Sequence, residues 1–208
     1  MKFEVLFWDF DGVIINSDEV RIKGFTETLK EFKVSDVQKL LNFHKRNGGL
    51  SRYVKFRYFF EEILHQTISD EQISYYAETF SVIMRQELVN KAYLIKETVS
   101  FIENIHGLGK LQFIVSGSDQ IELQYLCDEL EISSFFKEIK GSPTSKIDLV
   151  RQLLNEYSLD ISKCVLIGDS TNDYEAAQLN DIDFYGYNNS ELRSLGNYII
   201  SFFDNKWS

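Results

Sequence analysis

Three short segments are apolar at nearly every position, and they constrain the fold more than any other feature of this chain. They are residues 3–8, 111–115 and 164–167. A strand that is apolar on both faces is typical of a parallel sheet covered by helices on both sides. Each segment ends at small or acidic residues, where a strand would give way to a loop. We therefore expect an α/β fold with a parallel sheet.

Amphipathic helical patterns separate these strands. They cover residues 98–105, 121–130, 146–157 and 173–179, and two weaker strand candidates follow at 183–187 and 198–202. Strand–helix alternation predicts a doubly wound, Rossmann-like sheet.

Residues 17–92 break this alternation. They contain helical patterns at 20–32, 37–44, 52–65 and 70–89, and no convincing strand. The sequence therefore predicts a core domain of residues 1–16 and 93–208, with an all-helical domain of residues 17–92 inserted after the first strand. Gly48 and Gly49 are the expected flexible break in the insertion.

Composition limits the classes of partner and the location that we expect for the chain. The chain has 22 Lys and Arg against 32 Asp and Glu, a net charge of −10. Such a surface repels phosphate backbones and anionic lipid, so we expect neither a nucleic acid nor a membrane as partner. The two cysteines, Cys127 and Cys164, lie in apolar stretches and are expected to be reduced core residues. With no apolar run of about 18 residues and no signal peptide, a cytoplasmic location is expected.

Carboxylates follow two of the strands. Asp9 and Asp11 come directly after the first strand, and Asp169 and Asp173 follow the strand at 164–167. Open α/β sheets place their sites at this edge, although an isolated Asp-x-Asp-Gly is also compatible with a polar turn. Four carboxylates would repel one another, and Mg²⁺, which prefers oxygen ligands, would relieve that repulsion.

A phosphate site is suggested by two further segments. Ser116-Gly117-Ser118 ends a third strand, where a hydroxyl and backbone N–H groups at a helix start would suit phosphate. Lys146 opens a helix, and its ammonium would balance a carboxylate–phosphate centre.

In combination, these motifs resemble the haloacid dehalogenase superfamily of phosphohydrolases. The four family motifs correspond to Asp9-x-Asp11-Gly12, Ser116, Lys146, and Gly168-Asp169 with Asp173. The helical insertion is similar to the type 1 cap of the phosphoglycolate phosphatase and β-phosphoglucomutase branch. The resemblance thus covers the whole chain.

The resemblance implies a role for each motif residue. Asp9 would be the nucleophile that becomes an aspartyl-phosphate, and Asp11 the general acid and then the base. Mg²⁺ would be bound by the carboxylates of Asp9 and Asp169 and by the backbone carbonyl of Asp11, with Asp173 binding directly or through water. The phosphoryl group would be held by Ser116, the Gly117 amide and Lys146.

Gly49-Leu50-Ser51-Arg52 resembles a turn in β-phosphoglucomutase caps whose arginine faces the far anionic group of the substrate. The alternative is a helix N-cap at Ser51 followed by a solvated Arg52. Lys45, Arg46, Lys55 and Arg57 make this region basic. His44 is expected to be a partly exposed structural residue, with a polar contact as the alternative.

Two departures from the mutase pattern favour hydrolysis. Gly168 precedes Asp169 where mutases tend to have Glu, and Arg21 stands where they usually have a cap histidine. We therefore expect a Mg²⁺-dependent phosphatase of a small metabolite, a sugar phosphate or related anionic phosphate. The alternatives are a phosphosugar mutase and a catalytically silent binding or regulatory protein. The substrate and the oligomeric state stay open.

Overall fold

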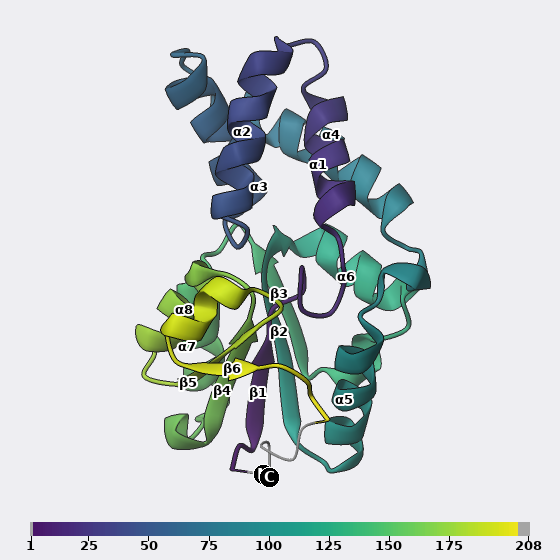
Figure 1. Cartoon of the computed structure of the whole chain (residues 1–208), viewed down its shortest axis with the longest axis vertical. Coiled ribbons are helices and arrows are strands. Elements are labelled where there is room, and N and C mark those ends of the chain that lie inside the picture. The colour runs from purple at the N-terminus through teal and green to yellow at the C-terminus, as the bar shows by residue number, and fades with distance from the viewer. Residues whose placement is uncertain (1, 204–208) are drawn as a thin grey trace.

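The computed structural model describes residues 2–203, and within them the strands form one parallel sheet (Figure 1). The strand order is β3-β2-β1-β4-β5-β6. The strands are β1 (Val5–Trp8), β2 (Leu111–Asp119), β3 (Glu138–Ser142), β4 (Cys164–Gly168), β5 (Asp183–Tyr187) and β6 (Asn197–Ile199). In the centre, Phe7 of β1 is in register with Phe113 of β2 and Leu166 of β4. The α/β fold class predicted from the sequence is confirmed.

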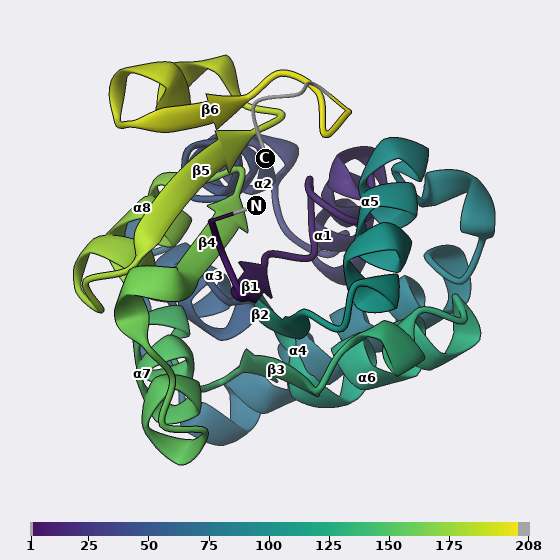
Figure 2. The same cartoon turned by 90° about the horizontal axis from the view of Figure 1, so that it is seen from below.

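Helices cover both faces of this sheet (Figure 2). They are α5 (Lys96–Gly107), α6 (Gln120–Glu129), α7 (Lys146–Glu156) and α8 (Thr171–Gln178). Successive β1 side chains alternate between the faces. Phe7 packs with α7 and α8, whereas Trp8 packs with α5 and α6. Burial on both faces explains why the strand is apolar at every position.

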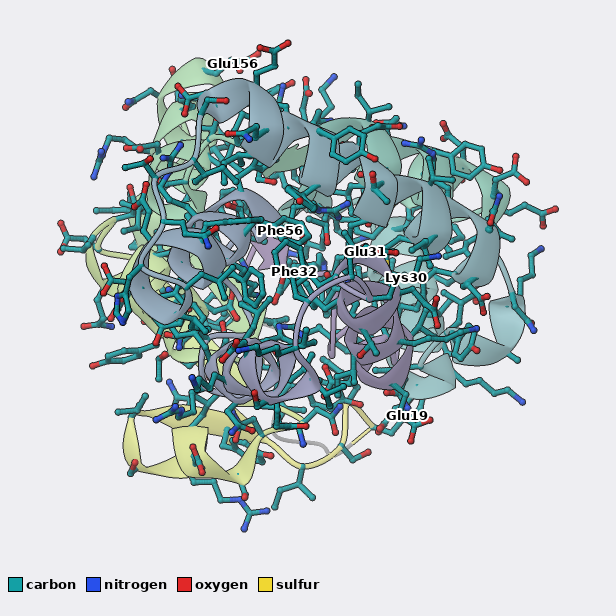
Figure 3. All side chains as sticks on the ribbon, turned by 90° about the horizontal axis from the view of Figure 1, so that it is seen from above. Glu19, Lys30, Glu31, Phe32, Phe56 and Glu156 are labelled. Carbon is teal, nitrogen blue, oxygen red and sulfur yellow. The ribbon has the colours of Figure 1, made fainter. Side chains whose placement is uncertain are left out.

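A second group of helices lies beyond the carboxyl edge of the sheet, at the top of Figure 1, and we call it the helical layer. It consists of α1 (Asp18–Thr28), α2 (Val34–Arg46), α3 (Arg52–Tyr58), its π-helical continuation η1 (Phe59–Ile63), and α4 (Asp70–Glu87). Its core is aromatic: Phe25 lies 5.5 Å from Phe56 and 4.5 Å from Phe80, ring centre to ring centre. Figure 3 shows Phe32 and Phe56 among these helices.

Short 3-10 helices complete the chain. They are η2 (Lys91–Tyr93), η3 (Ser133–Phe135), η4 (Ile161–Lys163) and η5 (Ser190–Ser194). Both cysteines are buried and free, as expected. Among the helices of residues 2–203, none is long and apolar enough to span a bilayer.

Three sequence predictions need correction. The edge strand β3 was not predicted, because Ile139 is its single large apolar residue. Helix α1 ends at Thr28 rather than 32, and the chain turns so that Phe32 packs against the rings of η1. The last strand ends at Ile199 rather than 202, because the Phe202 amide donates instead to Glu97 at the start of α5.

Candidate active site

Three carboxylates meet at the carboxyl edge of the sheet. Asp9 follows β1, Asp169 follows β4, and Asp173 comes from the first turn of α8. One oxygen from each lies within 4.8 Å of the others. Asp9 and Asp173 are buried, and Asp169 is half-buried. The carboxylates predicted to share an edge therefore do converge, with the exception of Asp11, described below.

Two glycines allow this convergence. Gly12 has φ +73°, and a Cβ there would lie 1.9 Å from the Asp169 carboxylate. A Cβ at Gly168 would lie 2.3 Å from the side chain of Asp173. Both positions therefore need glycine, because a side chain would push a carboxylate out of the cluster.

Lys146 is the cation beneath this cluster. It begins α7, as predicted, and Ser145 is the N-cap of that helix. Its ammonium lies 2.8 Å from Asp9 Oδ1 and also pairs with Asp173. Both Lys146 and Asp9 are almost fully buried, so little water screens their attraction.

One ammonium does not balance three carboxylates. Burial and the charge of Asp173 raise the pKa of Asp9 to about 7, although Lys146 opposes the shift. Burial and the charge of Asp9 raise the pKa of Asp169 well above its usual range. A second cation would remove both effects, and an all-carboxylate set is the chemistry that Mg²⁺ prefers. The residues therefore fit a hard divalent ion.

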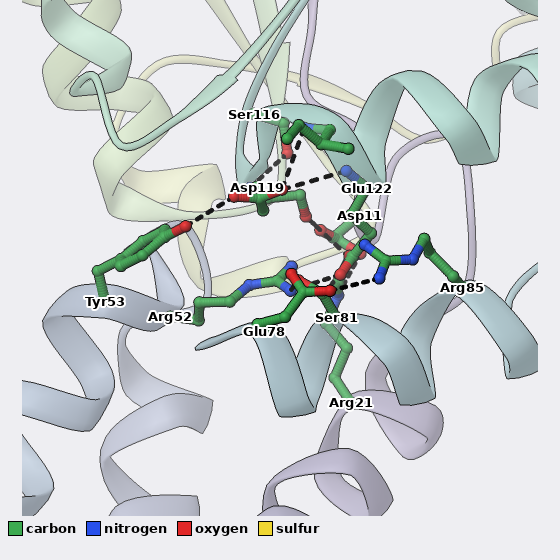
Figure 4. A network of polar contacts seen from close by, with 12 residues as sticks. Asp11, Arg21, Arg52, Tyr53, Glu78, Ser81, Arg85, Ser116, Asp119 and Glu122 are labelled. Atoms are coloured by element: carbon green, nitrogen blue, oxygen red, sulfur yellow. Dashed lines mark hydrogen bonds and ion pairs between the residues drawn. The ribbon is translucent and has the colours of Figure 1, made fainter. Parts of the chain in front are cut away.

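Asp11 is not among the three clustered carboxylates, and Figure 4 shows it in a separate network of polar contacts with Arg21. Its carboxylate accepts hydrogen bonds from Ser17 Oγ at 2.5 Å, Arg21 Nε at 2.6 Å and Ser118 Oγ at 2.6 Å. Burial alone would raise the pKa of Asp11, but Arg21, Ser118 and Ser17 outweigh it and hold that pKa at about 2. In this arrangement Asp11 is a carboxylate.

The Ser116 segment differs from its prediction in one respect. Ser116 and Gly117 lie within β2, whereas α6 begins at Gln120 with Asp119 as its N-cap. Hence no helix start provides the N–H groups of this segment. Gly117 instead approaches the loop between α2 and α3, because a Cβ on Gly117 would lie 2.4 Å from the Gly49 carbonyl.

A buried carboxylate, Glu122 of α6, joins the sheet core to the helical layer. It pairs with Arg21 of α1 at 3.3 Å and with Arg52 of α3 (Figure 4). Glu122 has no exposed surface. Sequence analysis missed this residue, and the available signal was its position four residues before Leu126, on the buried face of α6.

Arg52 has a structural partner as well as a place in the site. Ser51 caps α3, as the alternative interpretation required, but Arg52 is 3% exposed and hence not solvated. One guanidinium nitrogen donates to both Glu122 and Ser81, and the other terminal nitrogen has no hydrogen-bond partner among the described residues. A contact between Arg52 and a substrate stays a prediction.

A cavity connects these groups. From the core it is lined by Asp9, Asp11, Asp169 and the Ser116–Ser118 segment, and from the helical layer by Arg21, His44, Arg52 and Lys55. Lys146 lines the neighbouring cavity. Lys146 therefore reaches Asp9 from outside the cavity that Asp9 lines. Asp173 supports the same cluster from α8.

Two polar residues of this lining are more buried than expected. His44 is 5% exposed, so its prediction as a partly exposed residue is wrong; it packs 5.1 Å from the Phe25 ring. Burial and the charge of Lys55 lower the pKa of His44 to about 3. Lys55, which sequence analysis noted only as part of a basic region, is 3% exposed.

Comparison with known proteins agrees with this geometry. The sequence profile of the family described as "Haloacid dehalogenase-like hydrolase" matches residues 5–187. A phosphoglycolate phosphatase from Colwellia psychrerythraea is 23% identical over 201 residues, which cover 90% of this chain and 87% of the relative.

Solved structures share the fold. β-Phosphoglucomutase from Clostridium difficile has a TM-score of 0.77 at 13% identity, covering 99% of this chain and 95% of that one. A mutant of CbbY from Rhodobacter sphaeroides, solved in complex with xylulose-(1,5)bisphosphate, has a TM-score of 0.76 at 15% identity, covering 96% of this chain and 95% of that one.

The chain therefore belongs to the haloacid dehalogenase-like hydrolase family, as its motifs indicated. Within that family it is a phosphatase.

We expect Glu122→Gln to lower the free energy of unfolding by about 3–5 kcal/mol, because it leaves the buried Arg52 without a carboxylate among residues 2–203 and Arg21 with Asp11 alone. Glu129→Gln, an exposed change on the same helix, should alter it by less than about 0.5 kcal/mol. Urea unfolding measures both. Equal effects would show that the Glu122 pairs do not hold the two parts together.

Stability should depend on pH through Lys55. Burial and the charge of Arg21 lower its pKa from 10.5 to about 7 in the folded chain. Between these values the unfolded chain binds the extra proton, so the free energy of unfolding should rise with pH by up to about 1.4 kcal/mol per pH unit. Arg52 adds to the shift, whereas Asp11 and Asp18 oppose it.

Urea unfolding from pH 7.5 to 9.5, in buffer without phosphate or carboxylate, measures this slope. Lys55→Met should reduce it, and the exposed change Lys45→Met should leave it as in the wild type. The same slope in the wild type and Lys55→Met would contradict the assignment.

Proposed function

We propose that the enzyme is a Mg²⁺-dependent phosphomonoester hydrolase that works through an aspartyl-phosphate on Asp9. The observation that carries this proposal is the place of Asp9: buried, 2.8 Å from the Lys146 ammonium, in a three-carboxylate cluster, and open to the cavity. Such a carboxylate can attack phosphorus while the leaving oxygen departs toward the helical layer.

Several groups of this chain favour that attack. Lys146 opposes the rise in the pKa of Asp9 and so favours its ionised form, and it offsets the negative charge of the transferring phosphoryl group. Ser116 and the Gly117 amide, at the same strand edge, hold its oxygens. Mg²⁺, held by Asp9 and Asp169 with the Asp11 carbonyl and Asp173 nearby, would supply charge neutralisation for the nucleophile and the phosphate.

Asp11 would serve first as the acid for the leaving oxygen and then as the base for water. The ion pair with Arg21 favours its basic form. Donation of a proton requires that Asp11 leaves Arg21 and takes up a proton. The pairing of Asp11 with α1 makes that step depend on the helical layer.

We further propose that residues 17–92 act as a cap over a core of residues 1–16 and 93–208. The loop between α2 and α3 touches the core at two places, because a Cβ at Gly49 would lie 2.6 Å from Oγ of Ser170, the N-cap of α8, and Gly117 of β2 faces the Gly49 carbonyl. Closure there would exclude water from the aspartyl-phosphate until hydrolysis.

The substrate is proposed to be a small phosphorylated metabolite, a sugar phosphate or related anionic phosphate. Support comes from the cavity between the core and the helical layer, and from relatives whose names give phosphoglycolate and xylulose-(1,5)bisphosphate. A cytoplasmic location and the absence of nucleic-acid and membrane partners stay predictions from composition.

A metabolite panel with Mg²⁺ tests the function. Free phosphate should appear in step with substrate loss, without a bisphosphate activator, and EDTA should abolish it until excess Mg²⁺ is added. Ca²⁺ should replace Mg²⁺ poorly, because its looser coordination misplaces Asp9. Isomerisation with little phosphate release would indicate a mutase, and no turnover of any kind a silent protein.

Asp9→Asn should reduce turnover by roughly a thousandfold or more, since an amide is a poor nucleophile. Asp128→Asn, an exposed change on α6, should leave turnover unchanged. Burst-phase kinetics should show phosphoryl transfer to the wild-type protein and none to the variant. Near-normal turnover by Asp9→Asn would reject Asp9 as the nucleophile.

A further inference from the structure

Lys55 is a buried amine that pairs directly with no carboxylate of the described residues, although Asp11 and Asp18 attract it from a greater distance. It is 3% exposed, lines the cavity above Asp9, and donates to the Gly48 carbonyl at 2.8 Å. No carboxylate of residues 2–203 lies within 4 Å of it. A buried charge with a single neutral partner is unfavourable, so the position calls for an anion.

The two neighbouring cations differ from Lys55 in this respect. Arg21 pairs with Asp11 and Glu122, and Arg52 pairs with Glu122. These two guanidiniums and two carboxylates balance in charge. Asp18 also lines the cavity and attracts Lys55 from beyond 4 Å, so Lys55 is the one of these three cations without a directly paired carboxylate among residues 2–203.

Two further polar atoms at this wall lack partners among the described residues. His44 Nδ1 and one terminal nitrogen of Arg52 are both buried without a hydrogen bond, and both residues line the same cavity as Lys55. His44 is neutral there, because its pKa is lowered to about 3, so an imidazole protonated at Nδ1 can donate. Buried donors without acceptors are rare in folded proteins.

We propose that Lys55, with His44 Nδ1 and the unpartnered Arg52 nitrogen, binds a second anionic group of the substrate, a carboxylate or a phosphate. The reacting phosphoryl group would lie with Asp9 and Ser116, on the core side of the cavity, so an anion at Lys55 would belong to the far end of a short substrate. This inference rests on the proposed function and makes Lys55 the specificity-determining charge of the site.

The competing explanation is structural. Lys55 would then only hold the Gly48 carbonyl and so fix the loop that touches Gly117. Lys55→Gln separates the two roles, because it removes the charge and keeps an N–H donor. Lys55→Met, which removes both, is the second variant if Lys55→Gln folds poorly.

Three two-carbon phosphates that differ at the far end provide the probes. They are 2-hydroxyethyl phosphate, with a neutral end, 2-phosphoglycolate, with a carboxylate, and ethane-1,2-diyl bisphosphate, with a phosphate. Each is measured as a competitor of para-nitrophenyl phosphate hydrolysis with Mg²⁺, and by the shift in Tm that it causes, which needs no turnover.

The wild type should bind one or both of the doubly anionic compounds more tightly than the neutral one. Lys55→Gln should weaken that binding roughly ten- to a hundredfold, the range expected for a charged hydrogen bond, and should change the neutral compound by less than about twofold. The compound that loses more identifies the anion. Lys45→Met, an exposed lysine of α2, should change none of the three.

Equal losses for all three compounds would show that Lys55 only supports the loop, and no loss for any would show that its charge is unused; either result overturns the inference. Both leave the proposed function intact. Lys55-dependent Tm shifts without hydrolysis of any phosphomonoester would instead support the inference and reject the proposed function.

Discussion

The packing of Asp9, Asp169 and Asp173 around one buried ammonium is the constraint on which the site depends. Three carboxylates this close repel one another strongly when water is excluded, and Lys146 offsets only part of that repulsion. The sheet makes the arrangement feasible, because parallel strands deliver β1 and β4 to one edge and the helices that flank them supply Lys146 and Asp173. Gly12 then brings the chain against Asp169.

A second set of buried ion pairs fixes the helical layer over that edge of the sheet. Glu122 rises from the core helix α6, while Arg21 and Arg52 come from α1 and α3. Arg21 also pairs with Asp11. The same guanidinium therefore binds both Glu122, which joins the core to the helical layer, and the proposed acid–base group. The position of the layer and the orientation of Asp11 are therefore linked through a single side chain.

Sequence analysis succeeded where the signal is local. Strand β1 is apolar throughout because both of its faces are buried, and Asp9 follows it directly, so its place at the sheet edge was predictable. Strand β3 offered one large apolar residue and was missed. Pairs such as Glu122 with Arg52 join residues far apart in the chain, and no spacing reveals them. The burial of His44 likewise depends on the packing of Phe25 from another helix.

The buried cations of the helical layer differ in their partners. The turn at Gly49-Leu50-Ser51-Arg52 drew attention to Arg52 as the substrate contact, yet one of its terminal nitrogens is already committed to Glu122. Lys55, one helical turn further along α3, points to the same cavity without a carboxylate partner within the described part of the chain. A substrate anion there would give Lys55 the direct anionic partner that it lacks among residues 2–203, and would draw the helical layer and the core together at the same time.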